Sequence, residues 1–251
     1  MARTLPAPCA VVSCHVERPL DDAVWERFRA LQERRPGGLA VAALLRPADA
    51  AFGEDEREWA ARAREAATHA PLGHHTHWTA PDHARPTADG AGDRVRSEGA
   101  RLRALGLTPS LFCGGGWYTD HEVADACAEL GYADCTPRAT RPGYLAGGER
   151  WAELAGPARI GLGTGRSLLA IPTTHSLGGL ARALASRSLP RIVHVYFHDT
   201  DLLDRRRRAM VAVLLRALAL RREPSDLDAL AGALRESAPP VQWEVVARGG
   251  P

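Results

Sequence analysis

The stretch that decides the fold is residues 192–199, which reads Ile-Val-His-Val-Tyr-Phe-His-Asp. Its first six residues are mostly β-branched or aromatic and predict a buried strand at 192–197. The following residues, 203–222, have apolar positions at helical spacing and predict a long helix. A buried strand that ends in polar residues and leads into a helix is the repeating unit of parallel α/β folds, whose functional sites lie at the carboxyl ends of the strands.

The same alternation of strand and helix extends over the rest of the chain. Further strands are predicted at 10–16, 39–45, 72–78, 111–113, 132–135, 168–171 and 241–246, and further helices at 20–34, 54–69, 91–105, 120–130, 176–185 and 227–235. Residues 137–165 are rich in glycine and proline and predict a long loop beside a site. About seven strands fit either a doubly wound sheet or a (β/α) barrel, and because nothing marks an internal boundary we expect one domain over residues 1–251.

Composition and charge restrict the class of protein. The chain has 251 residues, of which 45% are hydrophobic and 25% charged, as in ordinary globular proteins. A net charge of +2 gives no indication of a nucleic-acid or anionic-membrane partner, and the run Arg205–Arg208 is interpreted as a solvated face. Five cysteines without a CxxC pair argue against disulfides and zinc ribbons. With no predicted membrane span or signal peptide, a cytoplasmic location is expected; the oligomeric state is left open.

Titratable side chains gather at the ends of three predicted strands. Alternation along a strand places the members of the first two pairs on one side. An imidazole and carboxylate set from separate strands can hold a divalent ion, above all zinc, which lowers the pKa of a bound water and polarises a carbonyl oxygen. The three pairs are His15 and Glu17, His75 and His77, and His198 and Asp199, of which His198 is placed to donate a proton to a leaving group.

Each pair also has a structural interpretation. A lone His-x-Glu at a strand end is most often a surface turn, and a histidine-rich segment can be a solvated loop. His194, inside the predicted strand, is interpreted as a core histidine with satisfied hydrogen bonds, and the cysteines as small core residues. The coincidence of three pairs at strand ends, rather than any single pair, therefore carries the prediction of a site.

Three segments resemble motifs of the polysaccharide deacetylases, carbohydrate esterase family four. Residues 73–78, Gly-His-His-Thr-His-Trp, resemble the second motif, and residues 111–117, Leu-Phe-Cys-Gly-Gly-Gly-Trp, with Leu-Gly-Tyr at 130–132, resemble the region of the third. Residues 195–199, Val-Tyr-Phe-His-Asp, resemble the strand with the late catalytic histidine. The ordered resemblance runs from about residue 10 to 215 and indicates a divergent member.

The resemblance implies an irregular (β/α) barrel that removes acetyl groups from sugars with a divalent metal held by Asp, His and His. In such enzymes a further Asp acts as base and a late His as acid. Carried over to this sequence, the metal carboxylate is Glu17, the first metal histidine is His75 and the general acid is His198.

The sequence departs from the family pattern at three positions. His15 stands where the base aspartate is expected and is either a base or a ligand. The second metal histidine should stand at Thr79, so His77 or His83 would replace it. Cys113 stands where an arginine normally holds the base aspartate, and Arg85 is the alternative source of positive charge. Loss of both the aspartate and its arginine indicates a remodelled site.

The first functional hypothesis is a metal-dependent hydrolase that removes an acyl (acetyl) group from an N- or O-acetylated sugar or related metabolite, with metal-bound water as nucleophile. The expected cofactor is a divalent metal, with zinc favoured. It acts on a carbon–nitrogen bond that is not a peptide bond, and a small molecule or glycan precursor is the expected substrate. His15, His198 and Asp199 would be catalytic, and Glu17, His75 and His77 would hold the metal. Alternatives are an inactive deacetylase-like barrel that binds a glycan, and an amidohydrolase-like enzyme, where a His-x-His pair occurs on the first strand.

Overall fold

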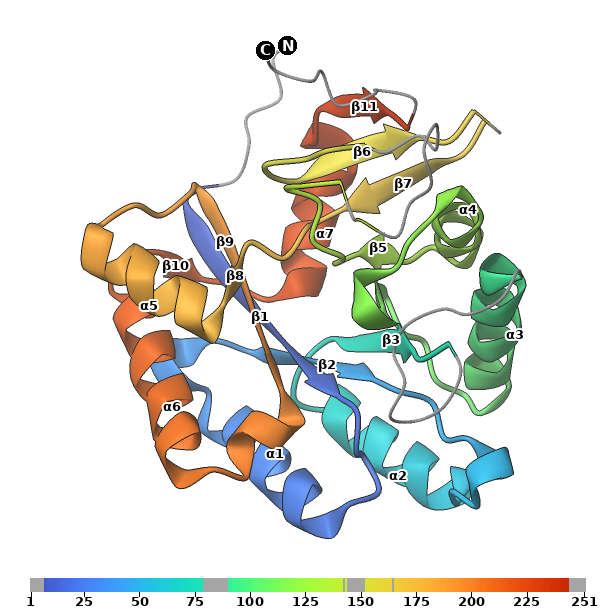
Figure 1. The fold of residues 1–251 in the computed structure, drawn as a ribbon, viewed down its shortest axis with the longest axis horizontal. Coiled ribbons are helices and arrows are strands. Elements are labelled where there is room, and N and C mark those ends of the chain that lie inside the picture. The colour runs from blue at the N-terminus through green and yellow to red at the C-terminus, as the bar shows by residue number, and fades with distance from the viewer. Residues whose placement is uncertain (1–6, 79–89, 142, 144–151, 164, 244–251) are drawn as a thin grey trace.

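The computed structural model describes residues 7–78, 90–141, 143, 152–163 and 165–243. Its strands belong to one sheet of eleven strands, with helices outside them (Figure 1). The strands are β1 (Cys9–Val16), β2 (Val41–Leu45), β3 (Leu72–Thr76), β4 (Leu111–Gly114), β5 (Ala133–Asp134), β6 (Ala158–Gly161), β7 (Ser167–Ala170), β8 (His175–Ser176), β9 (Ile192–His198), β10 (Glu223–Pro224) and β11 (Pro240–Gln242).

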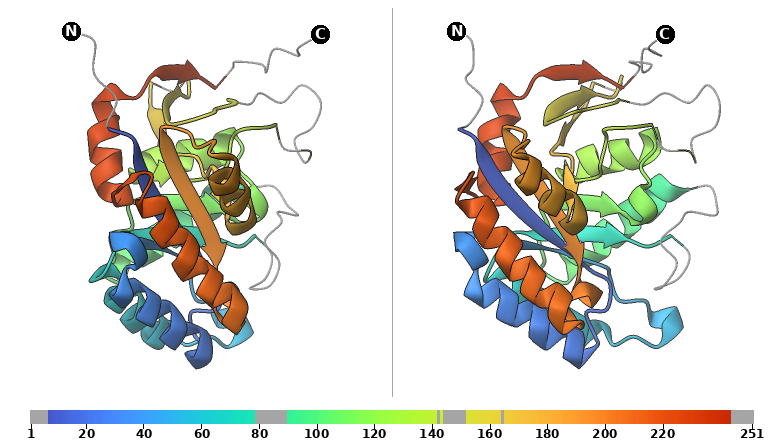
Figure 2. Two further views of the ribbon diagram at one scale, coloured as in Figure 1. Left: turned by 90° about the vertical axis from the view of Figure 1, so that its left-hand side faces the viewer. Right: turned by 60° about the vertical axis from the view of Figure 1, so that its left-hand side comes forward.

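Seven α-helices surround the sheet in the described part of the chain, and α5 and α6 lie side by side on one flank (Figure 2). They are α1 (Asp22–Arg34), α2 (Glu56–Ala67), α3 (Ala91–Ala104), α4 (His121–Leu130), α5 (Leu177–Ser186), α6 (Arg205–Ala219) and α7 (Leu227–Ser237). Short 3-10 turns include η1 (Pro36–Gly38), η2 (Ala50–Phe52), η3 (Gly115–Trp117) and η4 (Asp199–Leu202). No helix in the described ranges is both long enough and apolar enough to span a bilayer.

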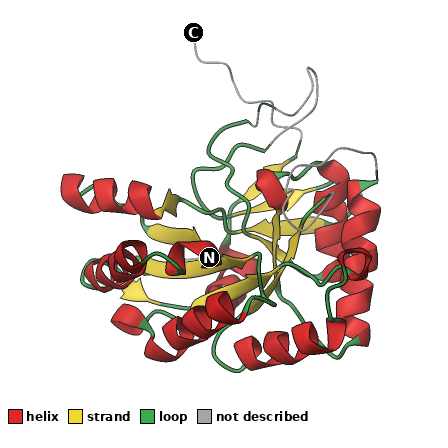
Figure 3. Ribbon diagram, turned by 60° about the horizontal axis from the view of Figure 1, so that its bottom comes forward, coloured by secondary structure: helices red, strands yellow, loops and turns green. Residues whose placement is uncertain are grey.

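The strands run in the order β11-β6-β7-β5-β4-β3-β2-β1-β9-β8, with β10 beside β1. Every pairing is parallel except that of β6 with β7. The predicted α/β class and parallel sheet are confirmed, and the strands lie inside the helices as in a (β/α) barrel (Figure 3). Two details need correction. The sheet has eleven strands rather than about seven, and it does not close into a barrel over the described residues.

The extra strands have a local physical reason. β6 pairs antiparallel with β7, so part of the predicted loop 137–165 forms a hairpin with the predicted strand at 168–171. β8 and β10 are only two residues long, too short to show any hydrophobic period. They are defined by pairing with β9 and β1, which depends on tertiary structure.

The longer elements form where the sequence predicts them. In α1, Asp21 caps the helix by accepting a hydrogen bond from the Val24 N–H, and Val24, Phe28 and Leu31 are buried on one side. Asp120 caps α4 in the same way, and Gly131 ends it with a φ of 75°, a left-handed conformation that favours glycine. Helices with one apolar side thus cover strands that are buried on both faces.

The register of the parallel strands determines which side chains meet. His15 of β1 lies beside His198 of β9, and His75 of β3 lies beside Cys113 of β4. Because β1, β2, β3 and β9 are neighbours in one parallel sheet, their carboxyl ends reach the same edge. The three polar pairs predicted at strand ends are therefore brought to one place.

Candidate metal centre and active site

Glu17, His75 and His77 form a compact cluster at this edge of the sheet. Each offers one ligand atom, and the three atoms lie within 4.8 Å of one another. Glu17 follows β1 directly, His75 is in β3, and His77 follows β3. His75 and His77 share one side of the chain, as the alternation of side chains along a strand predicts.

The distances within the cluster match those between ligands of a small ion. The Glu17 Oε1 lies 3.7 Å from the His75 Nε2 and 3.6 Å from the His77 Nε2, and the two Nε2 atoms are 3.2 Å apart. Tetrahedral zinc with bonds of about 2.0–2.1 Å separates its ligand atoms by about 3.4 Å. Two imidazole nitrogens and one carboxylate oxygen are also a donor set that zinc uses, so the residues present fit such an ion.

A hydrogen bond on the side of the ring away from the cluster fixes the orientation of the His75 imidazole. Its Nδ1–H donates a hydrogen bond of 2.7 Å to the Cys113 backbone oxygen, which leaves the Nε2 lone pair facing the cluster. Metal-binding histidines are typically held in this manner by a backbone carbonyl or carboxylate. The strand pairing that places Cys113 opposite His75 therefore also sets the tautomer of the imidazole.

The protonation states of the cluster suit ion binding. Burial raises the pKa of Glu17, but the imidazoles of His75 and His77 lower it by more, so that the net pKa falls well below the usual range. Burial lowers the pKa of His75, and its contact with Glu17 only partly offsets this. At neutral pH the carboxylate is ionised, and the His75 nitrogen that faces it has a free lone pair.

His198 joins the cluster from β9. Its Nε2 lies 3.6 Å from the same Glu17 Oε1, and its side chain is 35% exposed. His75 and His77 are buried, whereas Glu17 and His198 are partly open to solvent. A histidine at the accessible side of such a cluster is in reach of a bound substrate, either as a proton donor or as a further ligand.

His15 lies beside the cluster rather than within it. Its ring centroid is 4.5 Å from that of His75 and 5.2 Å from that of His198, and Trp117 and Tyr196 pack against it. Burial, and after it the neighbouring His75 and His198, lower its pKa well below the usual value. Its Nε2 is buried and has no hydrogen-bond partner among the described residues. The imidazole is thus neutral at pH 7 with an unused nitrogen, and its role as base or ligand stays a prediction.

Asp199 is fully buried and differs from the other predicted site residues in its contacts. One carboxylate oxygen accepts a hydrogen bond from the backbone N–H of Arg18, and the other accepts one from the backbone N–H of Thr200, both at 2.8 Å. Burial raises its pKa to about 6 in spite of these bonds. These contacts tie η4 to the loop that follows β1, so Asp199 positions the backbone around Glu17 and His198.

His74, the histidine of this segment that is not part of the cluster, faces away from it. The His74 Nε2 lies 2.8 Å from the Glu98 Oε2, which also accepts a hydrogen bond from the Thr76 hydroxyl. Arg94 of the same helix donates to Glu98 and to the Trp78 backbone oxygen. Sequence analysis did not identify this contact between β3 and α3, which fixes the strand that carries His75.

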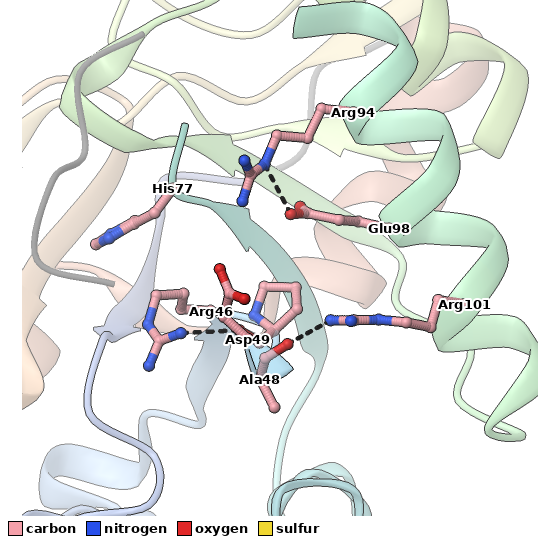
Figure 4. Close-up of a pocket in the computed structure, with 8 residues that line it drawn as sticks. Arg46, Ala48, Asp49, His77, Arg94, Glu98 and Arg101 are labelled. Carbon is pink, nitrogen blue, oxygen red and sulfur yellow. Dashed lines mark hydrogen bonds and ion pairs between the residues drawn. The ribbon is translucent and has the colours of Figure 1, made fainter. Parts of the chain in front are cut away.

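Arg46 is a second residue that sequence analysis missed. Its side chain is 4% exposed, its Nε donates to the Glu17 backbone oxygen at 2.9 Å, and both of its Nη atoms bind the Glu54 carboxylate. With His77 it lines a small hollow, together with Pro47, Ala48, Asp49, Arg94, Glu98 and Arg101 (Figure 4). Only its place just after a predicted strand could have indicated a site residue, because its partners lie 8 and 29 positions away.

Two larger hollows open beside the cluster. One of about 660 Å³ is lined by Glu17, Arg18, Arg46 and Thr200 with parts of α1 and Glu54. Another of about 290 Å³ is lined by His198 and Tyr196 together with residues of α5 and α6. Small-molecule sites typically occupy about 300–1,000 Å³, so the larger hollow has room for a sugar-sized group.

The structure also places other residues that the sequence analysis singled out. His194 is fully buried between the Ser13 hydroxyl and the Ile171 backbone oxygen, both 2.9 Å from its ring nitrogens, which confirms it as a core histidine. All five cysteines are free and buried, as predicted for core residues. Thr79, His83 and Arg85 lie outside the described residues, so His77 is the one of the two candidate replacements that can be placed.

Comparisons with known proteins bear on the fold. No protein-family model and no curated protein matches the sequence. A protein from Mycobacterium smegmatis described as a "putative polysaccharide deacetylase" has a similar structure, with a TM-score of 0.66 and 11% identity over 98% of this chain and 96% of that one. The resemblance to polysaccharide deacetylases is thus confirmed for the fold.

Two other solved structures are similar over most of this chain. A 4-alpha-glucanotransferase from Thermococcus litoralis has a TM-score of 0.60 and 11% identity, over 97% of this chain but only 43% of its own length. A family 4 carbohydrate esterase from Streptomyces lividans has a TM-score of 0.44 and 12% identity over 87% of this chain and 90% of that one. Proteins described as a deacetylase and as a glucanotransferase share this fold, so the fold alone does not determine the reaction.

Proposed function

We propose that this protein is a metal-dependent hydrolase that removes an acyl group, acetyl above all, from an N- or O-acylated sugar or a related metabolite. The observation that carries the proposal is the cluster of Glu17, His75 and His77, whose ligand atoms are 3.2–3.7 Å apart. Zinc is the ion proposed, because two imidazoles and one carboxylate suit it better than they suit magnesium or calcium. When bound, zinc lowers the pKa of a water and polarises a carbonyl oxygen.

The residues of the chain then have distinct proposed roles. Glu17, His75 and His77 hold the ion, and the hydrogen bond from His75 to the Cys113 oxygen keeps the imidazole in the binding tautomer. His198, partly exposed at the rim, donates a proton to the departing amine or alcohol. His15, neutral and buried beside His75, accepts a proton during attack or completes the ligand set.

Of the two kinds of acyl group, we propose that the N-acyl group, whose amide bond belongs to a sugar and not to a peptide, is the preferred one. The hollow of about 660 Å³ next to Glu17 has side chains of both charges, which suits a group rich in hydroxyls. A cytoplasmic location is part of the proposal and is supported by the five free cysteines, so a glycan precursor or small metabolite is favoured over a cell-wall polymer.

The test begins with metal content. Elemental analysis of the purified protein should find close to one divalent ion per chain, lost in Glu17→Gln and in His75→Gln. His121→Gln is the matched control, because His121 bonds to the Leu162 oxygen outside the cluster and its loss should leave the metal in place. Absence of metal from the wild type, even after incubation with zinc, would refute the proposal.

Activity is tested on a panel of N- and O-acetylated monosaccharides and sugar nucleotides, by measuring released acetate. His198→Gln should keep the metal and lower turnover by about 10²–10⁴-fold, the usual contribution of a general acid. If His198→Gln loses the metal instead, His198 is a ligand and its assignment as acid is wrong.

The alternative is a protein that binds an acylated sugar without hydrolysing it. It is favoured by two departures of the sequence from the pattern that the resemblance expects: His15 in place of the base aspartate, and Thr79 in place of the second metal histidine. Stoichiometric metal and measurable sugar binding, with no acetate released over the whole panel, would establish this alternative and exclude the hydrolase.

A further inference from the structure

Arginine is distributed unevenly along the chain, and the net charge of +2 conceals this. Residues 176–223 contain ten arginines and four acidic residues, whereas acidic residues are in excess over the rest of the chain. This segment includes α5 and α6, which pack against each other on one flank of the molecule (Figure 2). The segment that contains these two helices therefore has an excess of positive charge.

The same flank also exposes apolar side chains. Of the five large hydrophobic side chains exposed within the described ranges, four lie in α6 or within two residues of its ends, and Val213 and Leu220 are 61% and 86% exposed. Met210, Val213 and Leu220 follow each other at helical spacing and share the outward side of α6. The opposite side packs in the core through Val211, Leu215 and Leu218.

Arginines flank this apolar stripe. Arg206 and Arg216 are exposed, lie within one or two turns of Val213 and have no ion pair or hydrogen bond from their side chains in the described structure. In the first turn of α6, where the helix dipole disfavours positive charge, Arg207 pairs with Asp201 and Arg208 donates to the Leu202 backbone oxygen, whereas Arg205 and Arg206 have no such side-chain partner in the described structure. The stability of the helix does not explain why Arg205, Arg206 and Arg216 stand here, so we look for an interaction outside the fold.

We propose that the outward side of α6 docks on an anionic lipid bilayer. We call this surface the α6 face and define it by Arg205, Arg206, Met210, Val213, Arg216 and Leu220. Arginines attract anionic headgroups and can extend their long stems along the interface, while the apolar stripe enters the boundary between headgroups and acyl chains.

Other occupants fit the α6 face less well. Nucleic acid would account for the arginines but not for the exposed methionine, valine and leucine between them. A second copy of the chain, related by twofold symmetry, would place the same arginines opposite each other and be repelled. An anionic bilayer satisfies both the charge and the apolar stripe.

The α6 face adjoins the candidate active site. The hollow of about 290 Å³ is lined by Met210 and Arg207 from α6 and also by Tyr196 and His198. Docking through α6 would therefore bring the rim of the site to the membrane surface. The docking itself does not depend on the proposed hydrolase activity, since none of its contacts involves the metal cluster.

The experiment is co-sedimentation of the full chain with vesicles made of equal parts phosphatidylcholine and phosphatidylglycerol, or of phosphatidylcholine alone. Wild type should bind the anionic vesicles at low salt, release at high salt and leave neutral vesicles unbound. Arg206→Glu/Arg216→Glu should lower the partition coefficient by roughly tenfold or more. Val213→Asp should lower it while changing the charge by only one unit.

The matched control is Arg57→Glu/Arg235→Glu, which makes the same change in charge on α2 and α7 and should bind like wild type. Circular dichroism and thermal unfolding verify that each variant is folded. Failure of wild type to bind anionic vesicles, equal losses in the two double variants, or equal binding to neutral vesicles would each overturn the proposal. So would a wild-type dimer in sedimentation velocity that Val213→Asp dissociates, because the α6 face would then join two copies.

Discussion

Replacing Arg46 by methionine tests whether a buried ion pair supports the loop that carries Glu17. Methionine keeps an unbranched stem and removes the guanidinium, leaving the Glu54 carboxylate, whose side chain is only 19% exposed, without its cation. Removing one partner of a buried pair typically costs about 3–5 kcal/mol. In a chain of this size each kcal/mol lowers Tm by about 2–4 °C, so the fall in Tm should be roughly 6–20 °C.

The stability lost in Arg46→Met should be larger at neutral pH than in acid. Burial raises the pKa of Glu54, but the hydrogen bonds from Arg46 and the Asp49 N–H lower it by more, and the net pKa falls. A carboxyl group with a lowered pKa in the folded state stabilises the protein above its unfolded pKa of about 4.3, and this stabilisation is lost as pH falls through the folded pKa. The difference between wild type and Arg46→Met should therefore be largest at neutral pH and smaller in acid.

Urea denaturation at neutral and at acidic pH measures both effects, with Arg57→Met on α2 as an exposed control that should change stability by less than about 0.5 kcal/mol. The double variant Arg46→Met/Glu54→Leu should recover part of the loss, because no unpaired charge stays buried. Zinc affinity of Arg46→Met should fall by about 10–100-fold, since Arg46 holds the Glu17 backbone oxygen. A loss below about 1 kcal/mol, or a double variant less stable than Arg46→Met, would refute the reasoning.

Three further predictions concern the core beneath the site. Burial lowers the pKa of His194 to about 4 in the folded protein. As the pH falls, His194 therefore becomes protonated in the unfolded chain before it does so in the folded one. Stability should fall between pH 6.5 and 4 by up to about 1.4 kcal/mol per unit, and His194→Gln should show a shallower fall in urea titrations. Gly114→Ala should cost about 1–3 kcal/mol by thermal unfolding, because a Cβ there would lie 2.0 Å from the Tyr118 backbone oxygen. His15→Asp alone should destabilise the fold by about 3–5 kcal/mol by burying an unpaired charge, and His15→Asp/Cys113→Arg should be more stable in the same denaturation assay.

The sequence predicts best the elements whose hydrophobic period is long and clear. β9 and α1 begin and end within two residues of their predictions, because continuous apolar runs and capping residues are local signals. β6, β8 and β10 were missed, since two to four residues cannot show a period and their pairing is decided by distant strands. The closure of the sheet was predicted only by family resemblance, and the described strands do not close.

The candidate site was predictable as far as strand ends and side-chain alternation reach. These two rules predicted that Glu17, His75 and His198 lie together. In the structure the Nε2 atoms of His75 and His198 lie within 3.7 Å of the same Glu17 carboxylate oxygen. Their chemical roles stay predictions. The contacts that hold them, through Arg46 and Glu98, join residues 22 to 29 positions apart in different elements, and no local pattern encodes such pairs.

The changes at positions 15 and 113 make physical sense together. The resemblance expects an aspartate and an arginine there, and the chain has a histidine and a cysteine. Burial lowers the pKa of His15 and raises that of Cys113, so both side chains are neutral at pH 7. Replacing a buried ion pair by two neutral groups avoids the desolvation cost of both charges, whereas replacing only one would leave the other unpaired. Glu17 is then the only carboxylate among the three candidate ligands, so a bound dication would leave this ligand set with a net positive charge, which favours substrates whose reacting group develops negative charge.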